Sequence, residues 1–409
     1  MVRYQFPFRD FFQWALLLPL TIPGYVKANG HVDFLPFPPL LTAISIFTLT
    51  LFPVVYLFAR YAFLIQSGNL HKASISLGVS RWIHLTQIAL PMALPFTVLA
   101  GLLVMSVSVF DIGVVSFLSV ETLAMGTFQA LDNKNIVLGV SSLVFLLVLF
   151  VVLFLPFVNY LLKKDRYCPS GEESIPISRE ILSKTKGGLV TAFFASLLIM
   201  GFIIPISQLL LWGAKIKWEY SNARSIFELW SNLALVLVVA SVVVLVTLAS
   251  LVVRKSKARL VRLTTVVGKV SRVLPFIAVA VGTIILLAYW EGDVLSAFLL
   301  AYCLHYVGII TYVVFIMLEQ LEVSQLRVLT HHGNPQYIQL ISTLLAKMFK
   351  KENGIVILMI LLVLVRDLPV AFASIGHSDW VYLSAMSMVI IGSIPVLFLI
   401  WNTRKQGVR

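Results

Sequence analysis

The sequence predicts an all-α polytopic membrane protein with about ten spanning helices. The first observation is composition: 59% of the residues are hydrophobic and 12% are charged, whereas soluble domains carry about 25% charged residues. The second is that apolar runs of about 18 residues or more recur along the chain. The third is the uneven placement of positive charge between these runs. A water-soluble fold of this length could not bury so much apolar surface, whereas a bilayer accepts it on the outside of a helix bundle.

The apolar runs are continuous and rich in leucine, which is typical of spanning helices. The first run is the weakest because Pro19 and Pro23 interrupt it. Spanning helices tolerate proline where neighbouring groups satisfy the freed carbonyls, so a span is still expected there. The predicted spans are residues 11–28, 38–59, 86–110, 136–160, 188–212, 229–253, 273–290, 294–318, 354–375 and 380–401.

The basic residues predict the orientation of these spans. The chain carries a formal net charge of +13. Ten spans place both termini on one side of the membrane, and 25 of the 31 lysines and arginines fall on that side. The positive-inside rule makes that side cytoplasmic. Short cytoplasmic loops account for the excess charge, so no nucleic-acid partner is expected.

A polar segment at residues 163–187 reads as a cytoplasmic linker between two halves. The first half, residues 1–162, has four predicted spans, and the second half, residues 188–409, has six. A weak internal repeat relates the halves: Gly78 and Gly333 each begin a similar segment, in which Trp82 aligns with Tyr337. Two parallel copies imply a pseudo-two-fold bundle with its axis along the membrane normal.

The stretch around Gly78 is the most informative part of the first half. Ala73 and Leu77 fall on one face of a short predicted helix. Gly78 suits the left-handed residue that ends such a helix. Ser80 can cap the next helix, which runs through Trp82 into the bilayer. This pattern predicts a cytoplasmic elbow that either docks into a groove of a cytoplasmic partner or only connects two spans.

The residues that usually carry catalysis or metal binding form no cluster. Cys168 falls in a loop and Cys303 in a span, so a disulfide between them is not expected. There is no phosphate-binding loop, no metal-ligand motif and no nucleophile–base pair. His71 and His84 flank the elbow, where a position at the membrane interface fits them. The sequence therefore predicts that this chain is not an enzyme and binds no cofactor.

The loop at residues 66–91 resembles the EAA loop of the binding-protein-dependent permeases of type I ABC importers. That loop has the pattern E-A-A, three residues, glycine, and then an aromatic residue and Leu-Pro. The residues that match it are Ala73, Leu77, Gly78, Ser80, Trp82, Leu90 and Pro91. The flanking segments resemble fused iron(III)-type permeases, and they are residues 11–28, 51–64, 109–117 and 365–372. The likeness covers nearly the whole chain and is most specific in the first half.

The resemblance implies a MetI-like fold in which two fused halves form the path of a small solute through the inner membrane of a bacterium. It implies a separate cytoplasmic ATPase, expected as a homodimer that holds the ATP, and an extracytoplasmic solute-binding protein. Alternating access driven by that ATPase would move the solute. Iron(III) follows from the likeness alone, since related permeases carry thiamine, polyamines or other solutes. The ATPase-docking residues it implies are Ala73, Leu77, Gly78, Ser80, Trp82, Gly333 and Tyr337.

Three departures from the family pattern bear on coupling and topology. Lys72 and Arg327 stand where the family has glutamate, so the charge is reversed in both loops. The second loop, residues 322–346, is degenerate, with Ala346 in place of proline. Fused permeases of this kind have six spans in each half, so the first half here is expected to lack two N-terminal helices. Met1 falls where the loop before the third span would be.

Three charged residues lie near the outer ends of predicted spans: Asp111, Arg366 and Asp367. Charge within a membrane is costly and often functional, which makes these residues candidates for a gate or for contact with the binding protein. The alternative is that they reach the outer interface as ordinary solvated charges.

Two other functions remain open from the sequence. A secondary transporter driven by an ion gradient would need acidic residues at midspan and helices broken near the bilayer centre. Most acidic residues here fall in loops or at span ends, which counts against that reading. A degenerate permease paralogue without transport activity would explain the reversed charges at Lys72 and Arg327.

Overall fold

The computed structural model describes residues 1–32, 37–64, 76–111, 113–123 and 179–215, together with residues 66, 73–74 and 125–126 and scattered positions at 141–152 and 385–401. The chain forms two compact units, of which the first comprises residues 1–129, 173–234 and 362–409. All helices and strands named below belong to this first unit. Four predicted spans, 229–253, 273–290, 294–318 and 354–375, lie outside the described residues, as does most of 136–160.

Among the described residues the longest α-helix is α3 (Pro39–Leu64), which is helical over nearly all of the predicted span at residues 38–59. Proline suits the first position of a helix, because the N–H that it lacks would have no partner there. Pro53 lies inside the helix and is buried. At 26 residues, α3 is about 39 Å long, which exceeds the hydrocarbon thickness of a bilayer.

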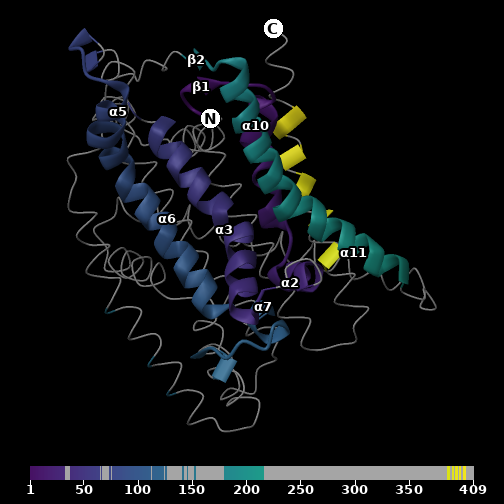
Figure 1. Cartoon of the computed structure of the whole chain (residues 1–409). Helices are drawn as coiled ribbons and strands as arrows, with labels where there is room; N and C mark the ends of the chain where they lie inside the picture. The colour runs from purple at the N-terminus through teal and green to yellow at the C-terminus, as the bar shows by residue number, and fades with distance from the viewer. Residues whose placement is uncertain are drawn as a thin grey trace, which may run out of the picture. The chain divides into compact units, whose positions relative to one another are not determined.

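A second helical stretch packs along α3 (Figure 1). It begins with α5 (Arg81–Ile83), continues as a π-helix, η2 (His84–Ala89), and ends as α6 (Leu90–Phe110). The predicted span at residues 86–110 is thus helical throughout. The rings of Tyr61 and Phe96 meet edge to face at 5.7 Å where the two helices pack.

A third helical stretch confirms the predicted span at residues 188–212. It consists of α10 (Lys184–Leu198), the π-helix η4 (Ile199–Ile203) and α11 (Ile204–Lys215). Within the part of the chain that the structure describes, two helices are long and apolar enough to cross a membrane, Pro39–Leu64 and Lys184–Ala214. The total number of spans stays a prediction.

The prediction of one spanning helix over residues 11–28 is wrong. Three short helices occupy this region: α1 (Arg9–Ala15), the 3₁₀ helix η1 (Leu18–Thr21) and α2 (Gly24–Val32). The two prolines explain the breaks. Pro19 lies in the first turn of η1, and Ile22 is extended because a residue before proline avoids the α region. The chain resumes a helix only after Pro23.

Lys27, which the sequence places on the outer side, is fully buried in α2. Its ammonium donates a hydrogen bond to the carbonyl oxygen of Pro19, in the preceding 3₁₀ helix. A buried ammonium needs such an acceptor because losing its hydration is costly. Breaking the helix therefore exposes a carbonyl that lets Lys27 be buried.

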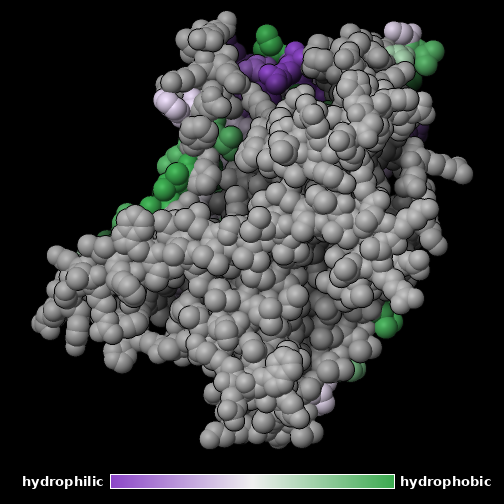
Figure 2. All heavy atoms as spheres, turned by 180° about the vertical axis from the view of Figure 1, so that it is seen from behind, coloured by the Kyte–Doolittle hydropathy of each residue, from purple (hydrophilic) through white to green (hydrophobic). Residues whose placement is uncertain are grey.

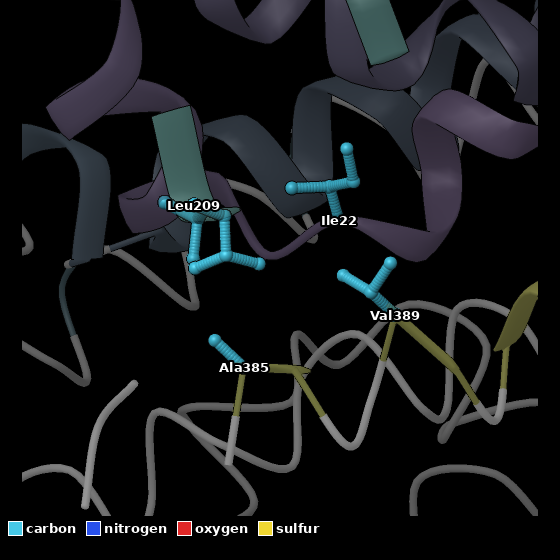
Figure 3. Close-up of a cluster of buried hydrophobic side chains, with 5 residues drawn as sticks. Ile22, Leu209, Ala385 and Val389 are labelled. Atoms are coloured by element: carbon cyan, nitrogen blue, oxygen red, sulfur yellow. The ribbon is translucent and has the colours of Figure 1, made fainter. Parts of the chain in front are cut away.

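A hydrophobic cluster joins segments that are far apart in the sequence (Figure 3). Ile22 and Val26 come from the region of α2, Leu209 comes from α11, and Ala385 and Val389 come from helical positions near the end of the chain. All five side chains are at most 4% exposed. The broken N-terminal region is thus part of the core and not a peripheral arm.

The first residues form a two-residue strand, which the sequence did not predict. β1 (Tyr4–Gln5) pairs in parallel with β2 (Glu180–Ile181), which immediately precedes α10. Figure 2 shows described hydrophilic side chains at the end of the molecule where β1 and β2 lie. Leu189, Phe193 and Leu210 are exposed hydrophobic side chains of residues 184–215.

Candidate functional site: the Gly78 elbow

The predicted turn at Gly78 is confirmed. Gly78 has a φ of 72°, in the left-handed region that a side chain disfavours. The N–H of Val79 bonds back to the carbonyl oxygen of Ser74 at 3.0 Å. This six-to-one hydrogen bond is the mark of a Schellman ending, which satisfies a carbonyl left open at a helix C-terminus. The helical turn that contains Ala73, Ser74 and Leu77 therefore ends at a reversal of the chain.

The predicted cap at Ser80 is also confirmed. The Ser80 hydroxyl oxygen accepts a hydrogen bond from the N–H of Ile83 at 3.3 Å. The Ser80 carbonyl accepts one from the N–H of His84 at 2.9 Å, the first bond of the new helix. An N-cap of this kind fixes where the helix starts. The elbow is thus two helix ends, at Leu77 and Ser80, separated by a rigid turn.

Apolar side chains project from the tip of this elbow. Leu77 is 80% exposed and Trp82 is 72% exposed. Ile83 is partly exposed beside them, and Ala73, Gly78 and Ser80 are exposed as well. Exposed large apolar groups on a turn between helix ends are typical of a docking surface. Their role in binding a partner stays a prediction.

The base of the elbow is polar and buried. Ser74 and His84, on opposite sides of the turn, are each 4% exposed, and the Ser74 hydroxyl lies 2.7 Å from His84 Nδ1. The Arg3 guanidinium contacts His84 Nε2. Arginine can only donate, so Nε2 accepts and the proton of the neutral ring is on Nδ1, from which it is donated to Ser74. His84 is therefore buried, which differs from the expected interfacial position.

A further side chain holds the π-helix η2 in place. Gln66, just beyond α3, is 8% exposed, and its amide donates to the carbonyl oxygen of Ala89 at 2.8 Å. A π-helix disturbs the regular ladder of hydrogen bonds and often marks a functional position. Here it lies directly between the elbow and α6.

A second buried polar group lies beside α1 and the end of α3. Arg60 donates to the side chain of Gln13 at 3.2 Å and lies 4.8 Å from the centre of the Trp14 ring. Arg9 pairs with Asp10 at 2.6 Å. Burial lowers the pKa of Arg9, the nearby charges of Arg179 and Arg60 lower it further, and Asp10 opposes them. Both arginines keep polar contacts, as buried guanidinium groups require.

Asp111, a predicted gate residue, directly follows the last residue of α6. Its carboxylate oxygen accepts the N–H of Val114 at 2.9 Å and so caps α7 (Gly113–Phe117). This contact gives Asp111 a structural role without testing the predicted one. Arg366 and Asp367 lie outside the described residues, as do Gly333, Tyr337, Lys72 and Arg327.

The part of the chain that the structure describes holds no group of three or more histidines, cysteines or carboxylates that could bind a metal ion. Sequence reasoning missed Arg3 and Ser74. Arg3 is 81 residues from its partner His84, and no local pattern marks such a contact. The only signal was the presence of two polar residues, Ser74 and His84, one on each side of the turn.

Comparisons with known proteins find similar transport proteins. Residues 2–166 match the family model of the binding-protein-dependent transport system inner membrane component. The chain is 26% identical over 213 residues to the "Fe(3+)-transport system permease protein FbpB 2" of Haemophilus influenzae. That alignment covers 51% of this chain and 42% of the relative, so the chain spans less than half the length of the relative it matches. No solved structure matches.

The matched residues contain the elbow, α3, α5 and α6, with the glycine turn and the helix that follows it. The resemblance to the iron(III)-type permeases of type I importers is confirmed, and a polytopic helical membrane protein follows from it. Residues 2–166 are therefore similar to the binding-protein-dependent transport system inner membrane components.

Proposed function

We propose that the chain is the transmembrane permease subunit of an ATP-binding-cassette importer and that the Gly78 elbow is its docking site for a cytoplasmic ATPase. The observation that supports this best is the exposed pair Leu77 and Trp82 at the tip of a rigid turn. The similarity of residues 2–166, which include this turn, to a transport-system membrane component supports the proposal.

The helix after the elbow can transmit a movement of the ATPase to the membrane-spanning part of the chain. Residues 81–110 are helical without a break, so a displacement at Trp82 moves the start of α6 with it. Closure of an ATPase dimer on ATP would pull the elbow and switch the bundle between inward-facing and outward-facing states. The work would come from the different affinity of ATP for those two states.

The partners and the solute follow from the same proposal. A solute-binding protein would deliver the solute from outside, and both termini would lie in the cytoplasm. The name of the Haemophilus influenzae relative supports iron(III) as the solute. The positive residues Lys72 and Arg327, which replace glutamates of the family pattern, call for acidic residues in the ATPase groove.

The proposal is tested by co-purification of the full chain with an ATP-binding-cassette ATPase from the same organism. Trp82→Ala removes the exposed ring and should lower ATPase recovery at least tenfold, as loss of an anchor residue does. Trp401→Ala removes another exposed tryptophan and should leave recovery unchanged.

Gly78→Asp should also abolish binding of the ATPase, because residue 78 must adopt a positive φ. Gly126→Asp is its control, because a Cβ atom at Gly126 meets no other atom within 4 Å.

The docking proposal fails if the wild-type chain recovers no ATPase, or if Trp82→Ala and Gly78→Asp bind it as well as the wild type does. The degenerate-paralogue reading is supported if the chain binds the ATPase but never supports ATP-dependent uptake with any neighbouring binding protein.

One observation favours the second candidate, a secondary transporter. The broken helices at residues 9–32 and the buried ammonium of Lys27 resemble the interrupted helices at transporter binding sites. Uptake that persists in ATP-depleted vesicles and stops when the proton gradient collapses would establish this function and exclude the first.

A further inference from the structure

The first residues of the chain lie between the elbow and the start of α10. We name residues 3–7 the N-terminal strap. On one side, the strap pairs with β2: the N–H of Glu180 donates to the carbonyl of Arg3 at 2.9 Å, and the N–H of Leu182 donates to the carbonyl of Gln5 at 3.0 Å. Because β2 ends two residues before α10 begins, the strap is fixed to the N-terminal end of that helix.

Side-chain packing strengthens this attachment. The Thr191 hydroxyl, on α10, donates to the carbonyl oxygen of Pro7 at 3.1 Å. The rings of Phe6 and Phe194 stack at 5.8 Å. A Cβ atom built on Gly187 would lie 3.2 Å from the Pro7 ring, so the helix approaches the strap as closely as a glycine allows. The strap and the first turns of α10 therefore form one packed body.

On its other side, the strap reaches the elbow through the side chain of Arg3. The Arg3 guanidinium donates to His84 Nε2, and His84 Nδ1–H donates to the Ser74 hydroxyl. Ser74 precedes the Gly78 turn and His84 follows it, so the ring is bonded to both arms of the elbow. Both residues are buried, which makes their hydrogen bonds directional and hard to exchange for water.

We infer that the chain Arg3–His84–Ser74 is a mechanical link that holds the elbow to α10, and that His84 is its positioning residue. A force on the elbow then moves two helices together: α6 through the backbone and α10 through the strap. This inference rests on the proposed function, since docking of an ATPase supplies the force.

The two ring nitrogens of His84 bind different partners, so the bond to Arg3 and the bond to Ser74 can be tested separately. A glutamine amide can take the place of Nε2 and still accept from Arg3, whereas an asparagine amide reaches only the position of Nδ1 and the Ser74 hydroxyl. His84→Gln should therefore keep the link to the strap, and His84→Asn should break it. If His84 only filled space, His84→Gln and His84→Asn should have similar effects, because the result would not depend on which ring nitrogen the amide replaces.

The first experiment uses the full chain in lipid nanodiscs without an ATPase. Spin labels at Ser76 and Lys186, with Cys168 and Cys303 replaced by serine, report the distance from the elbow to α10. We expect one narrow distance distribution for the wild type and for His84→Gln, and a distribution at least twice as wide for Arg3→Ala and His84→Asn. The Arg3→Ala/His84→Asn double variant should be no wider than either single variant, because both remove the same link. Gln87→Ala, an exposed change on the same helix, is the control.

The inference is overturned if Arg3→Ala and His84→Asn leave the distribution narrow, or if their effects add in the double variant. Loss of folding is recognised separately, because it would broaden His84→Gln as well and lower the melting temperature of all variants alike.

The second experiment separates the link from docking. With the ATPase present, Arg3→Ala should still bind it, and solute uptake per ATP hydrolysed should fall about fivefold or more, as expected for a lost coupling contact. Unchanged uptake per ATP in Arg3→Ala contradicts the link, whereas failure of the wild-type chain to bind an ATPase contradicts the proposed function.

Discussion

Helix α3 and the rod formed by α10, η4 and α11 look alike in sequence but are packed differently. In the most apolar part of each, half of the residues of α3 are buried, compared with 17% for the rod. α3 contacts α2, α6, α7, η1 and the η4 part of the rod, whereas the rod presents Leu189, Phe193 and Leu211 as exposed side chains. The rod also packs closely at some points, for example where Gly201 meets Pro19 and the backbone of Leu49.

This difference shows that an apolar helix can pack either against the rest of the protein or with one face toward lipid. In a membrane, lipid covers an apolar face as well as protein does, so hydropathy alone does not distinguish a central helix from a peripheral one. Packing does distinguish them, because a tightly packed side chain loses its contacts when it is shortened and a lipid-facing one does not. The same kind of substitution should therefore lower the free energy of unfolding more at a buried position of α3 than at an exposed position of the rod.

The largest effect is expected for Ile46→Ala in α3. Ile46 is fully buried against Ala28, Ala43 and Val114, so its loss leaves a cavity that costs about 2–4 kcal/mol. Ile199→Ala, at a position 45% exposed on the rod, should cost less than about 1 kcal/mol. Reversible unfolding of the purified chain in detergent measures both. Equal losses would show that the rod is packed in the membrane as tightly as α3.

The next effect is expected where the rod approaches α3 and η1 closely, at Gly201. Gly201→Ala would place its Cβ atom 3.1 Å from the carbonyl oxygen of Leu49 and 3.1 Å from the Pro19 ring, so the helices must separate. We expect a loss of about 1–2 kcal/mol despite the higher helix propensity of alanine. The control Gly188→Ala has nothing within 4 Å and should be neutral or stabilising by up to about 1 kcal/mol. The same unfolding curves measure this change in stability. A neutral Gly201→Ala would mean that the two helices separate at little cost.

The smallest effect concerns hydroxyl groups that bond within their own helix. Thr50 is fully buried in α3, and its hydroxyl donates to the carbonyl of Ile46 at 2.7 Å. Thr50→Val keeps the shape and loses this bond, which should cost about 1 kcal/mol. The hydroxyl of Ser207, on the exposed side of α11, makes a similar bond to Ile204 at 2.8 Å, and Ser207→Ala should stay within about 0.5 kcal/mol. A larger loss at Ser207 than at Thr50 would reverse the comparison.

Features set by local chemistry could be predicted from the sequence. Gly78 ends a helix because only a residue without a side chain takes a positive φ freely, and Ser80 caps the next because its hydroxyl reaches an open N–H. The helices at 39–64 and 184–215 follow from long apolar runs. These arguments need only residues that are close together in the sequence.

Features set by distant contacts could not be predicted. The apolar run at 11–28 was strong enough to suggest a span, but Pro19 and Pro23 divided it, and the core cluster with Leu209 and Val389 stabilises the broken form. Burial of Lys27 depends on the carbonyl that this break provides. The contacts of Arg3 with His84 and of β1 with β2 join residues that no periodic pattern relates.

The pairing of β1 with β2 also has a consequence for synthesis. Tyr4 pairs with Glu180, so the first strand must wait for the ribosome to reach the second. At about 5–20 residues per second, this wait lasts roughly ten to thirty seconds. During that interval α3 and α6 are already made, while Arg3 has no strand to hold it beside His84. The elbow is therefore synthesised early, but its contact with Arg3 is stabilised only after β2 has been made.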